Sequence, residues 1–420
     1  YPPITIDNSF PWTSGTIRLN NAETFIYQKF GVDMSHSCTQ VINLGRTPQR
    51  FDGLVNTPVY RGSTILVNSF KEWEAHKQNG DSYRHYGRFG AATTKSFESA
   101  INALEGGAGC MVFPSGLSAC THALMAFVQA GDHVLIADNI YGPTRSFADH
   151  MLLKLGIQVE YFNSCDLYAL QTKIKRNTSV VFVESPGSIT LELSDIAAIS
   201  EISHRVGAKV LVDNSWATPL YFQPLHHGAD VSIQAVTKYI GGHSDILMGT
   251  ATANAVSIDQ LNQAVHCFGE TTSPDDIYLA SRGLRSLAVR LKQHQDNGLA
   301  VAKFLQLHPS VDVVNHPALD TSPDHQMWQQ QFTGATGLFS FYLKRSDPAF
   351  VERFVDSLRY FHIGLSWGGY ESLILPVGTP YRTQSKLPSD GYLIRIHVGL
   401  EHIEDLLADL QEALALAERV

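Results

Sequence analysis

Residues 230–245 read Asp-Val-Ser-Ile-Gln-Ala-Val-Thr-Lys-Tyr-Ile-Gly-Gly-His-Ser-Asp, and this stretch decides the fold. The apolar run from Val231 to Val236 is typical of a buried strand. Lys238 follows the run and precedes a polar segment that contains two glycines. Lys238 is therefore expected where a strand ends, which is the edge at which α/β sheets bind ligands. An ordinary surface lysine fits the same pattern, so Lys238 needs partners before it indicates a site.

A carboxylate is expected at the end of a second strand, upstream of the first. Residues 208–213 are mostly apolar and end in Asp213, and the interval to Lys238 suits one strand–helix–strand crossover. An amine and an acid at neighbouring strand ends suit pyridoxal phosphate (PLP). This cofactor needs a lysine for its Schiff base and an acid partner for its pyridine nitrogen. A structural salt bridge between the two side chains is the alternative.

The composition narrows the class of protein. The chain has 420 residues, 44% of them hydrophobic, which is enough for a large core and more than one domain. A net charge of −9 without a basic tract argues against nucleic acid as a partner. No apolar run reaches membrane-spanning length. The five cysteines are an odd number without a C-x-x-C pair, which predicts the reducing cytoplasm, no disulfide framework and no metal site.

The order of predicted elements indicates an α/β protein. Apolar strands alternate with helical stretches, which predicts a mostly parallel sheet covered on both faces. Ser194 is a candidate N-cap of a helix that runs to Val206, and another helix is expected over Thr144–Leu155. The predicted strands are Cys110–Phe113, His133–Ala137, Gln158–Phe162, Ser179–Glu184, Lys209–Asp213, Val231–Val236 and Met248–Ala253.

Three parts of the chain are predicted from changes in this pattern. Residues 1–85 show little periodicity and are expected to form an arm that packs on something else. Residues 86–284 form the predicted PLP-binding α/β domain. A boundary is placed near 284, within a long helical stretch, and residues 285–420 are expected to form a smaller α+β domain with strands at Gly337–Leu343 and Tyr392–Val398 and a last helix from Ile403.

Two segments have the chemistry to bind an anion. A strand, a small-residue turn and a helix meet at Gly116 and Leu117, and the free N–H groups of a helix start bind phosphate. A tight turn without a ligand fits this pattern equally well. Tyr86 and Arg88 lie two residues apart on a loop, where a hydroxyl and a guanidinium can face one anion. Ordinary surface positions are the alternative for both.

Arg395 and Tyr141 are further candidates. Arg395 interrupts an apolar run, Leu393 to Ile396, and a buried arginine needs a partner. A substrate carboxylate and a structural ion pair are both open. Tyr141 follows a predicted strand, where its ring would either stack on a flat cofactor or plug a turn.

Taken together and in order, several motifs resemble the trans-sulfuration (Cys/Met metabolism) family of PLP-dependent enzymes, and within it the bacterial cystathionine β-lyase branch. The resemblance runs from about residue 55 to the C-terminus. The motifs are Tyr86-Gly-Arg88, Glu105-Gly-Gly107, Phe113-Pro-Ser-Gly116, Glu184-Ser-Pro-Gly-Ser-Ile-Thr190, Asp213-Asn-x-Trp216, residues 230–239, Gly242-His-Ser-Asp245, Ser281-Arg-Gly-Leu-Arg285, Asn315-His-Pro-Ala-Leu319, Ser366-Trp-Gly-Gly-Tyr-Glu-Ser372 and Leu393-Ile-Arg395.

The resemblance implies PLP fold type I, which is aspartate-aminotransferase-like, and a role for each matching residue. Lys238 would hold PLP and move protons, and Tyr141 would stack on its ring as a second catalytic residue. Asp213 would pair with the pyridine nitrogen. The backbone of Gly116 and Leu117, with the Thr237 hydroxyl, would hold the phosphate. In a homodimer or homotetramer, Tyr86 and Arg88 would reach the phosphate in the neighbouring subunit, and Ser366, Trp367 and Arg395 would bind the substrate carboxylate.

The implied activity is that of a carbon–sulfur β-lyase of methionine biosynthesis, which cleaves cystathionine to homocysteine, pyruvate and ammonia. Four positions depart from the branch: Phe89 replaces an arginine, Leu365 and His266 replace tyrosines, and Ser146 replaces an acid. The resemblance associates these positions with the charged distal end of cystathionine. Burying that end without partners costs about several kcal/mol. A β-lyase for a less charged cysteine S-conjugate, a γ-lyase or γ-replacement enzyme, and a non-catalytic PLP-binding protein are the alternatives.

Overall fold

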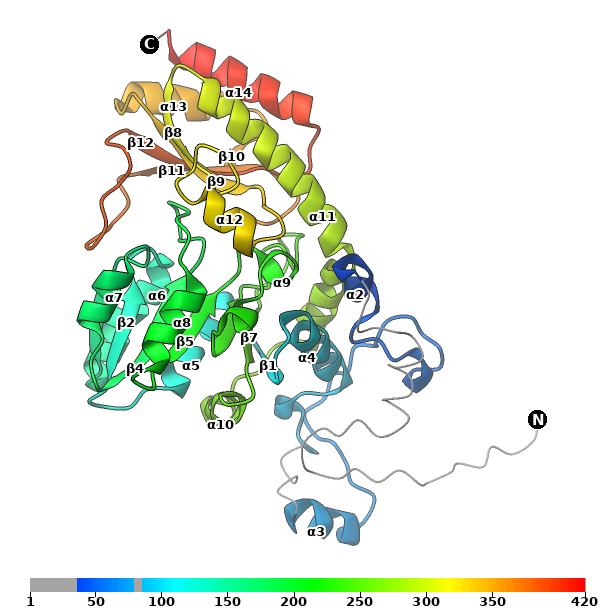
Figure 1. Ribbon diagram of the computed structural model, residues 1–420. Coiled ribbons are helices and arrows are strands. Elements are labelled where there is room, and N and C mark those ends of the chain that lie inside the picture. Colours follow the sequence, from blue (N-terminus) through cyan, green and yellow to red (C-terminus); the bar gives the residue numbers. More distant parts are fainter. Residues whose placement is uncertain (1–35, 79–84, 420) are drawn as a thin grey trace, which may run out of the picture.

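The computed structural model describes residues 36–78 and 85–419 (Figure 1). Part of the predicted N-terminal arm, residues 1–35 and 79–84, therefore lies outside the described residues. Within the arm, the structure contains α2 (Ser37–Asn43), η2 (Pro48–Arg50) and α3 (Phe70–Gln78). Helix α2 packs against the long helix α11 (Pro274–Leu307). The arm is thus more regular than its weak periodicity predicted.

A seven-stranded sheet forms the larger part of the molecule. Its strand order is β1-β7-β6-β5-β4-β2-β3, and β3, β2, β4, β5 and β6 are parallel, whereas β7 is antiparallel to both of its neighbours. Strands β2, β5, β6 and β7 are buried almost throughout, as expected for a sheet covered on both faces. The mostly parallel sheet predicted from the sequence is confirmed. The strands are β1 (Gly109–Phe113), β2 (His133–Ala137), β3 (Gln158–Phe162), β4 (Thr178–Glu184), β5 (Lys209–Asp213), β6 (Val231–Gln234) and β7 (Gly249–Ala253).

Helices cover the sheet, with α4 (Ala92–Glu105) against β1 and α5 (Gly116–Ala126) against β7 and β6. The helix predicted from Ser194 is α8 (Ile196–His204), and its N-cap is Asp195, whose carboxylate accepts a hydrogen bond from the Ala198 N–H at 3.0 Å. The helix predicted at 144–155 is three successive pieces: α6 (Gly142–Phe147), the π-helical turn η5 (Ala148–Leu152) and η6 (Leu153–Leu155). The remaining short elements are η4 (Gly87–Phe89), α7 (Leu167–Lys173), α9 (Thr218–Tyr221), η7 (Pro224–His227) and α10 (Ile258–Phe268).

Helix α11 links the two halves of the chain. Its 34 residues run without interruption past residue 284, where the sequence predicted a boundary. The first half of α11 buries Ile277, Leu284 and Leu291 beside α4, and the second half buries Val301 and Leu305 in another core. A division of the chain at residue 284 therefore falls inside a helix, and the domain boundaries stay a prediction.

The second core lies on a five-stranded sheet with the order β10-β11-β12-β9-β8. Strand β12 (Tyr392–His397) is antiparallel to both β11 (Leu373–Gly378) and β9 (Leu338–Leu343). Phe339, Phe341, Phe350 and Phe354 are fully buried in this core. This agrees with the predicted α+β region. The other elements are β8 (Val311–Asn315), α12 (His325–Gln331), α13 (Pro348–Asp356), β10 (His362–Ile363) and α14 (Ile403–Ala417).

The smaller sheet sits over the carboxyl ends of the parallel strands (Figure 1). The Trp216 indole, just after β5, donates a hydrogen bond to the Leu338 carbonyl at the start of β9, at 2.8 Å. This packing brings the loops of the smaller sheet to the strand ends that carry Asp213 and Lys238. In the described part of the chain, no helix combines the length and the apolar character needed to cross a membrane.

Candidate active site

Lys238 lies four residues after the end of β6, in the turn that the sequence predicted. Its Nζ donates a hydrogen bond to Ser366 Oγ at 2.9 Å and lies 5.2 Å from the centroid of the Trp367 ring. Burial lowers the pKa of Lys238 to about 8, and the nearby Arg395 charge adds to this, while Asp213 opposes it. A substantial fraction of the amine is therefore neutral near physiological pH, as a nucleophile or base requires.

The turn that carries Ser366 and Trp367 closely approaches the backbone at Lys238. Gly368, in this turn, has a φ of +84°, and a Cβ there would lie 2.7 Å from the Tyr239 nitrogen. The Gly368 N–H donates to His397 Nε2 at 3.1 Å. Any larger residue at 368 would push Ser366 away from the lysine.

Asp213 occupies the end of β5, beside β6. Its Oδ1 accepts hydrogen bonds from the Ser215 N–H at 3.0 Å and the Ser215 hydroxyl at 2.6 Å, and the Cys120 thiol donates to Oδ2 at 3.6 Å. Burial raises the pKa of Asp213, against the hydrogen bonds from Ser215. A cationic partner would offset that desolvation, which suits a carboxylate facing a protonated pyridine. Cys120 carries no sequence signal for this contact, because the contact depends on the packing of α5 under the sheet, whereas Ser215 meets Asp213 locally, two residues further along the chain.

Tyr141 stands at the start of α6 with a side chain that is 46% exposed. Its backbone N–H donates to Glu184 Oε2 at 2.6 Å. Glu184 pairs with Asp213 across β4 and β5, and burial, reinforced by the Asp213 charge, raises the pKa of Glu184 well above its usual range. The sequence motifs contained Glu184, but its role in holding the Tyr141 loop appears only in the structure.

Arg395 lies in β12, with its side chain at the same site. Its Nη2 donates to the carbonyl oxygens of Leu365 at 2.8 Å and of Ser366 at 3.2 Å. Burial lowers the pKa of Arg395 to about 10, and the proximity of Tyr141 opposes that effect. Among the described residues, no carboxylate forms an ion pair with this guanidinium. The structural ion pair considered from the sequence is therefore not present there, and the guanidinium has the chemistry to bind a carboxylate.

The predicted phosphate-binding residues lie at the start of α5 and in the turn after β6. Helix α5 begins at Gly116, where a Cβ would lie 2.7 Å from the Ala235 Cβ, so the turn is tight enough to require glycine. The Ser115 hydroxyl caps the Ser118 N–H at 3.0 Å, and the helix itself leaves the N–H groups of Gly116 and Leu117 without partners. The Thr237 hydroxyl bonds to the Met248 carbonyl at 3.2 Å and accepts from its N–H at 2.9 Å.

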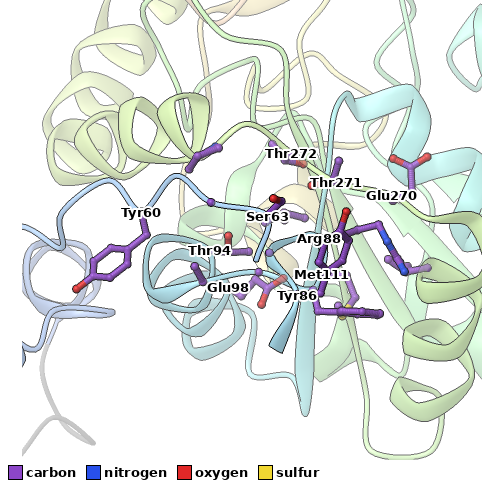
Figure 2. A pocket seen from close by; sticks show the side chains of 18 of the residues that line it. Tyr60, Ser63, Tyr86, Arg88, Thr94, Glu98, Met111, Glu270, Thr271 and Thr272 are labelled. Atoms are coloured by element: carbon purple, nitrogen blue, oxygen red, sulfur yellow. The ribbon is translucent and has the colours of Figure 1, made fainter. Parts of the chain in front are cut away.

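Tyr86 and Arg88 lie elsewhere in the same chain. They line a pocket of about 440 Å³ between α4, β1 and the segment after α10 (Figure 2), and none of Lys238, Asp213 or Arg395 lines it. Arg88 Nη1 donates to the His266 carbonyl at 3.3 Å, and Tyr86 is 47% exposed. The structure thus separates these two predicted phosphate ligands from the lysine of the same chain.

The four positions that depart from the resemblance fall into three places. Phe89 and His266 form an edge-to-face pair with ring centroids 4.9 Å apart, beside Arg88. Leu365 is 82% exposed and directly precedes Ser366. The Ser146 carbonyl lies 2.8 Å from His150 Nδ1, one turn away on the surface.

Comparisons with known proteins match about nine-tenths of the chain to one enzyme family. A family model described as Cys/Met metabolism PLP-dependent enzyme matches residues 38–415. The chain is 44% identical over 386 residues to a putative cystathionine beta-lyase of Rhizobium johnstonii, covering 91% of this chain and 96% of the relative. It is 41% identical over 387 residues to cystathionine beta-lyase MetC of Escherichia coli, covering 90% and 98%. The crystal structure of metB from Corynebacterium glutamicum is similar with a TM-score of 0.83 and 31% identity, covering 91% and 99%.

Proposed function

The chain belongs to the Cys/Met metabolism family of PLP-dependent enzymes and has the two-sheet architecture of PLP fold type I, and on this premise we propose that it is a carbon–sulfur β-lyase. Its substrate is L-cystathionine or a related cysteine S-conjugate, and its products are a thiol, pyruvate and ammonia. The E. coli relative named cystathionine beta-lyase MetC, at 41% identity, and the R. johnstonii relative named putative cystathionine beta-lyase, at 44%, support this reaction class. The five free cysteines support a cytoplasmic location.

The residues at the strand ends fit PLP. Lys238 would hold the cofactor, Asp213 would face the pyridine nitrogen, and Gly116 and Leu117 would offer N–H groups to the phosphate. Tyr141 would stack on the ring. When bound, PLP supplies an electron sink for the charge left at Cα after a proton is removed. The buried, restrained carboxylate of Asp213 is the observation that favours this assignment.

The chain's own groups then account for the reaction. Arg395 binds the substrate α-carboxylate, helped by Ser366 and Trp367. Lys238, with its lowered pKa, takes the Cα proton and returns a proton to the departing sulfur, which leaves with the electron pair of the Cβ–S bond. Water converts the released 2-aminoacrylate to pyruvate and ammonia. The observation that carries the proposal is the placement of the Lys238 amine between Ser366, Trp367 and the charges of Asp213 and Arg395.

A second subunit completes the site in this proposal. Tyr86 and Arg88 open onto a pocket of their own, apart from Lys238, and an exposed tyrosine beside an arginine there suits a phosphate held by another copy of the chain. The active unit is then at least a homodimer. Two copies related by a twofold axis would exchange these residues reciprocally.

A less charged S-conjugate is the second candidate substrate. The exposed Leu365 beside Ser366 and the paired rings of Phe89 and His266 favour it, because they offer no acid and little charge to the far end of cystathionine. An S-alkyl cysteine would avoid burying an unpartnered amine and carboxylate.

The proposal is tested by measuring pyruvate and thiol together. L-cystathionine, L-cystine and S-methyl-L-cysteine would each be incubated with PLP-saturated protein and with Lys238→Ala protein. Equal amounts of pyruvate and thiol, or of pyruvate and persulfide in the case of L-cystine, from wild-type protein alone support a β-lyase. Formation of 2-oxobutyrate without pyruvate would indicate a γ-lyase instead. Absence of any product, although PLP is bound, would indicate a non-catalytic PLP-binding protein.

A further inference from the structure

Asp138 receives an unusual number of hydrogen bonds for a residue outside the predicted site. It is buried directly after β2, and its carboxylate accepts the backbone N–H groups of Thr383 at 2.9 Å, Gln384 at 2.8 Å and Ser385 at 3.3 Å. The Thr383 hydroxyl adds a fourth bond at 2.8 Å. Three successive backbone N–H groups around one carboxylate form an anion-binding nest.

These donors belong to the loop between β11 and β12, residues 379–391. The loop projects from the smaller sheet toward the larger one (Figure 1). It leads directly into β12, which carries Arg395. A second attachment supports the first: Arg382 Nη2 donates to the Ser188 carbonyl at 2.8 Å and to the Thr190 hydroxyl at 2.7 Å.

Arg145 ties the same loop to the helix that follows Tyr141. Its Nη1 donates to Asp138 Oδ1 at 3.0 Å and its Nη2 to the Thr383 hydroxyl at 3.1 Å. The guanidinium carbon lies 3.7 Å from the centroid of the Tyr161 ring and 4.8 Å from that of Tyr381 in the loop. Burial alone would raise the pKa of Asp138, but the hydrogen bonds from the loop and from Arg145 outweigh it and lower the pKa.

The attachment lies between two groups of the active site. Tyr141 is three residues after Asp138, at the start of the helix that carries Arg145. Arg395 is four residues beyond the end of the attached loop. Tyr141 and Arg395 are close enough for the charge of each to affect the pKa of the other.

We propose that Asp138 is a positioning residue: by fixing the β11–β12 loop to the end of β2, it sets the separation of Tyr141 and Arg395, between which the amino-acid substrate binds. This rests on the proposed function, because the substrate carboxylate is assigned to Arg395. Asp138 touches neither reacting group and acts through the loop. Its loss therefore weakens substrate binding more than it slows the chemical step.

Asp138→Asn tests this with little change in size. In PLP-saturated protein, KM for the preferred S-conjugate is expected to rise about 30-fold while kcat changes less than about threefold. Thr383→Val, on the surface side of the same contact, is expected to raise KM about fivefold and serves if Asp138→Asn fails to fold. Gln384→Ala is the matched control, because it keeps the backbone N–H and removes only a side chain 3.5 Å from the Thr383 hydroxyl. An unchanged KM in the folded variants, with or without a fall in kcat, would overturn the positioning role.

Hydrogen exchange on the same proteins separates this inference from the proposed function. The amides of 383–385 are expected to exchange at least about tenfold faster in Asp138→Asn than in wild type or Gln384→Ala. Unchanged exchange would overturn the attachment whether or not the protein cleaves carbon–sulfur bonds. A wild-type protein without lyase activity but with the expected exchange pattern would overturn the proposed function alone.

Discussion

The surroundings of Lys238 and the pocket of Arg88 differ in how much of a binding site one chain supplies. Around Lys238, the amine donates a hydrogen bond to Ser366, and the charges of Asp213 on β5 and Arg395 on β12 shift its pKa in opposite directions. The Arg88 guanidinium, in contrast, donates to the His266 carbonyl and lies over the Phe89 ring, and Tyr86 is about half exposed. The first arrangement fits the proposed catalytic centre, and the second fits the proposed contribution of Tyr86 and Arg88 to a neighbouring subunit.

The largest effect is expected when Lys238 is replaced. Lys238→Ala removes the proposed base and cofactor anchor, so kcat for pyruvate release should fall about 10⁴-fold. The visible absorbance of PLP bound to the protein should disappear as well. Lys238→Arg, which keeps the charge but offers no neutral amine, is the matched control and should be equally inactive. Activity within about tenfold of wild type in either variant would contradict the assignment.

Replacement of Arg395 should weaken substrate binding. Arg395→Ala removes the guanidinium that donates to the Ser366 carbonyl, and loss of a charged hydrogen bond corresponds to a rise of about 10²-fold in KM. Arg395→Lys should recover part of this loss. Steady-state kinetics on PLP-saturated protein measures both variants, and a KM within twofold of wild type in Arg395→Ala would show that another group binds the carboxylate.

Mixed subunits would test whether the Arg88 pocket belongs to another copy. Arg88→Ala and Lys238→Ala proteins should each have low activity alone. If Arg88 serves the neighbouring subunit, co-refolding them in equal amounts should restore about a quarter of wild-type activity, because half of the random dimers carry one intact site. Activity no higher than that of the better parent would show that Arg88 and Lys238 act within one chain.

The lowered pKa of Lys238 predicts how fast the protein without cofactor takes up PLP. The neutral amine reacts, so the uptake rate should rise about tenfold per pH unit below pH 8 and level off above it. An ordinary lysine would show a rise continuing past pH 10. Stopped-flow absorbance measures the rate, and a profile still rising at pH 9.5 would contradict the role of burial and of Arg395.

A smaller effect is expected at Phe89. Phe89→Arg introduces a cation beside Arg88 and His266, and should raise kcat/KM for L-cystathionine relative to S-methyl-L-cysteine by about tenfold. Phe89→Leu, which adds no charge, is the control. An equal change for both substrates would show that this position does not contact the distal part of the substrate.

The predictions from the sequence were most accurate for contacts that depend on strand order. Asp213 ends β5 and Lys238 follows β6 by four residues, and the crossover rule predicts that these parallel strands are neighbours, which the structure confirms. The predicted strands of the larger sheet also agree with the structure to within two residues. Their long apolar runs reflect burial on both faces, which is a strong local signal.

Contacts that depend on packing could not be predicted in this way. Asp138 meets Thr383 across some 245 positions of the chain, and no local pattern relates a strand end to a loop of another sheet. Cys120 reaches Asp213 only because α5 lies under β5 and β6. Strand β11 contains a proline and several half-buried residues, so its periodicity is weak.

The most direct test of a β-lyase is to determine which of the two carbon–sulfur bonds of L-cystathionine is broken. Cleavage at Cβ gives homocysteine and pyruvate, whereas cleavage at Cγ gives cysteine and 2-oxobutyrate. Mass spectrometry of the products from PLP-saturated wild-type protein, with Lys238→Ala protein as the control, should show homocysteine and pyruvate in equal amounts. Cysteine and 2-oxobutyrate as the main products would contradict the proposed function.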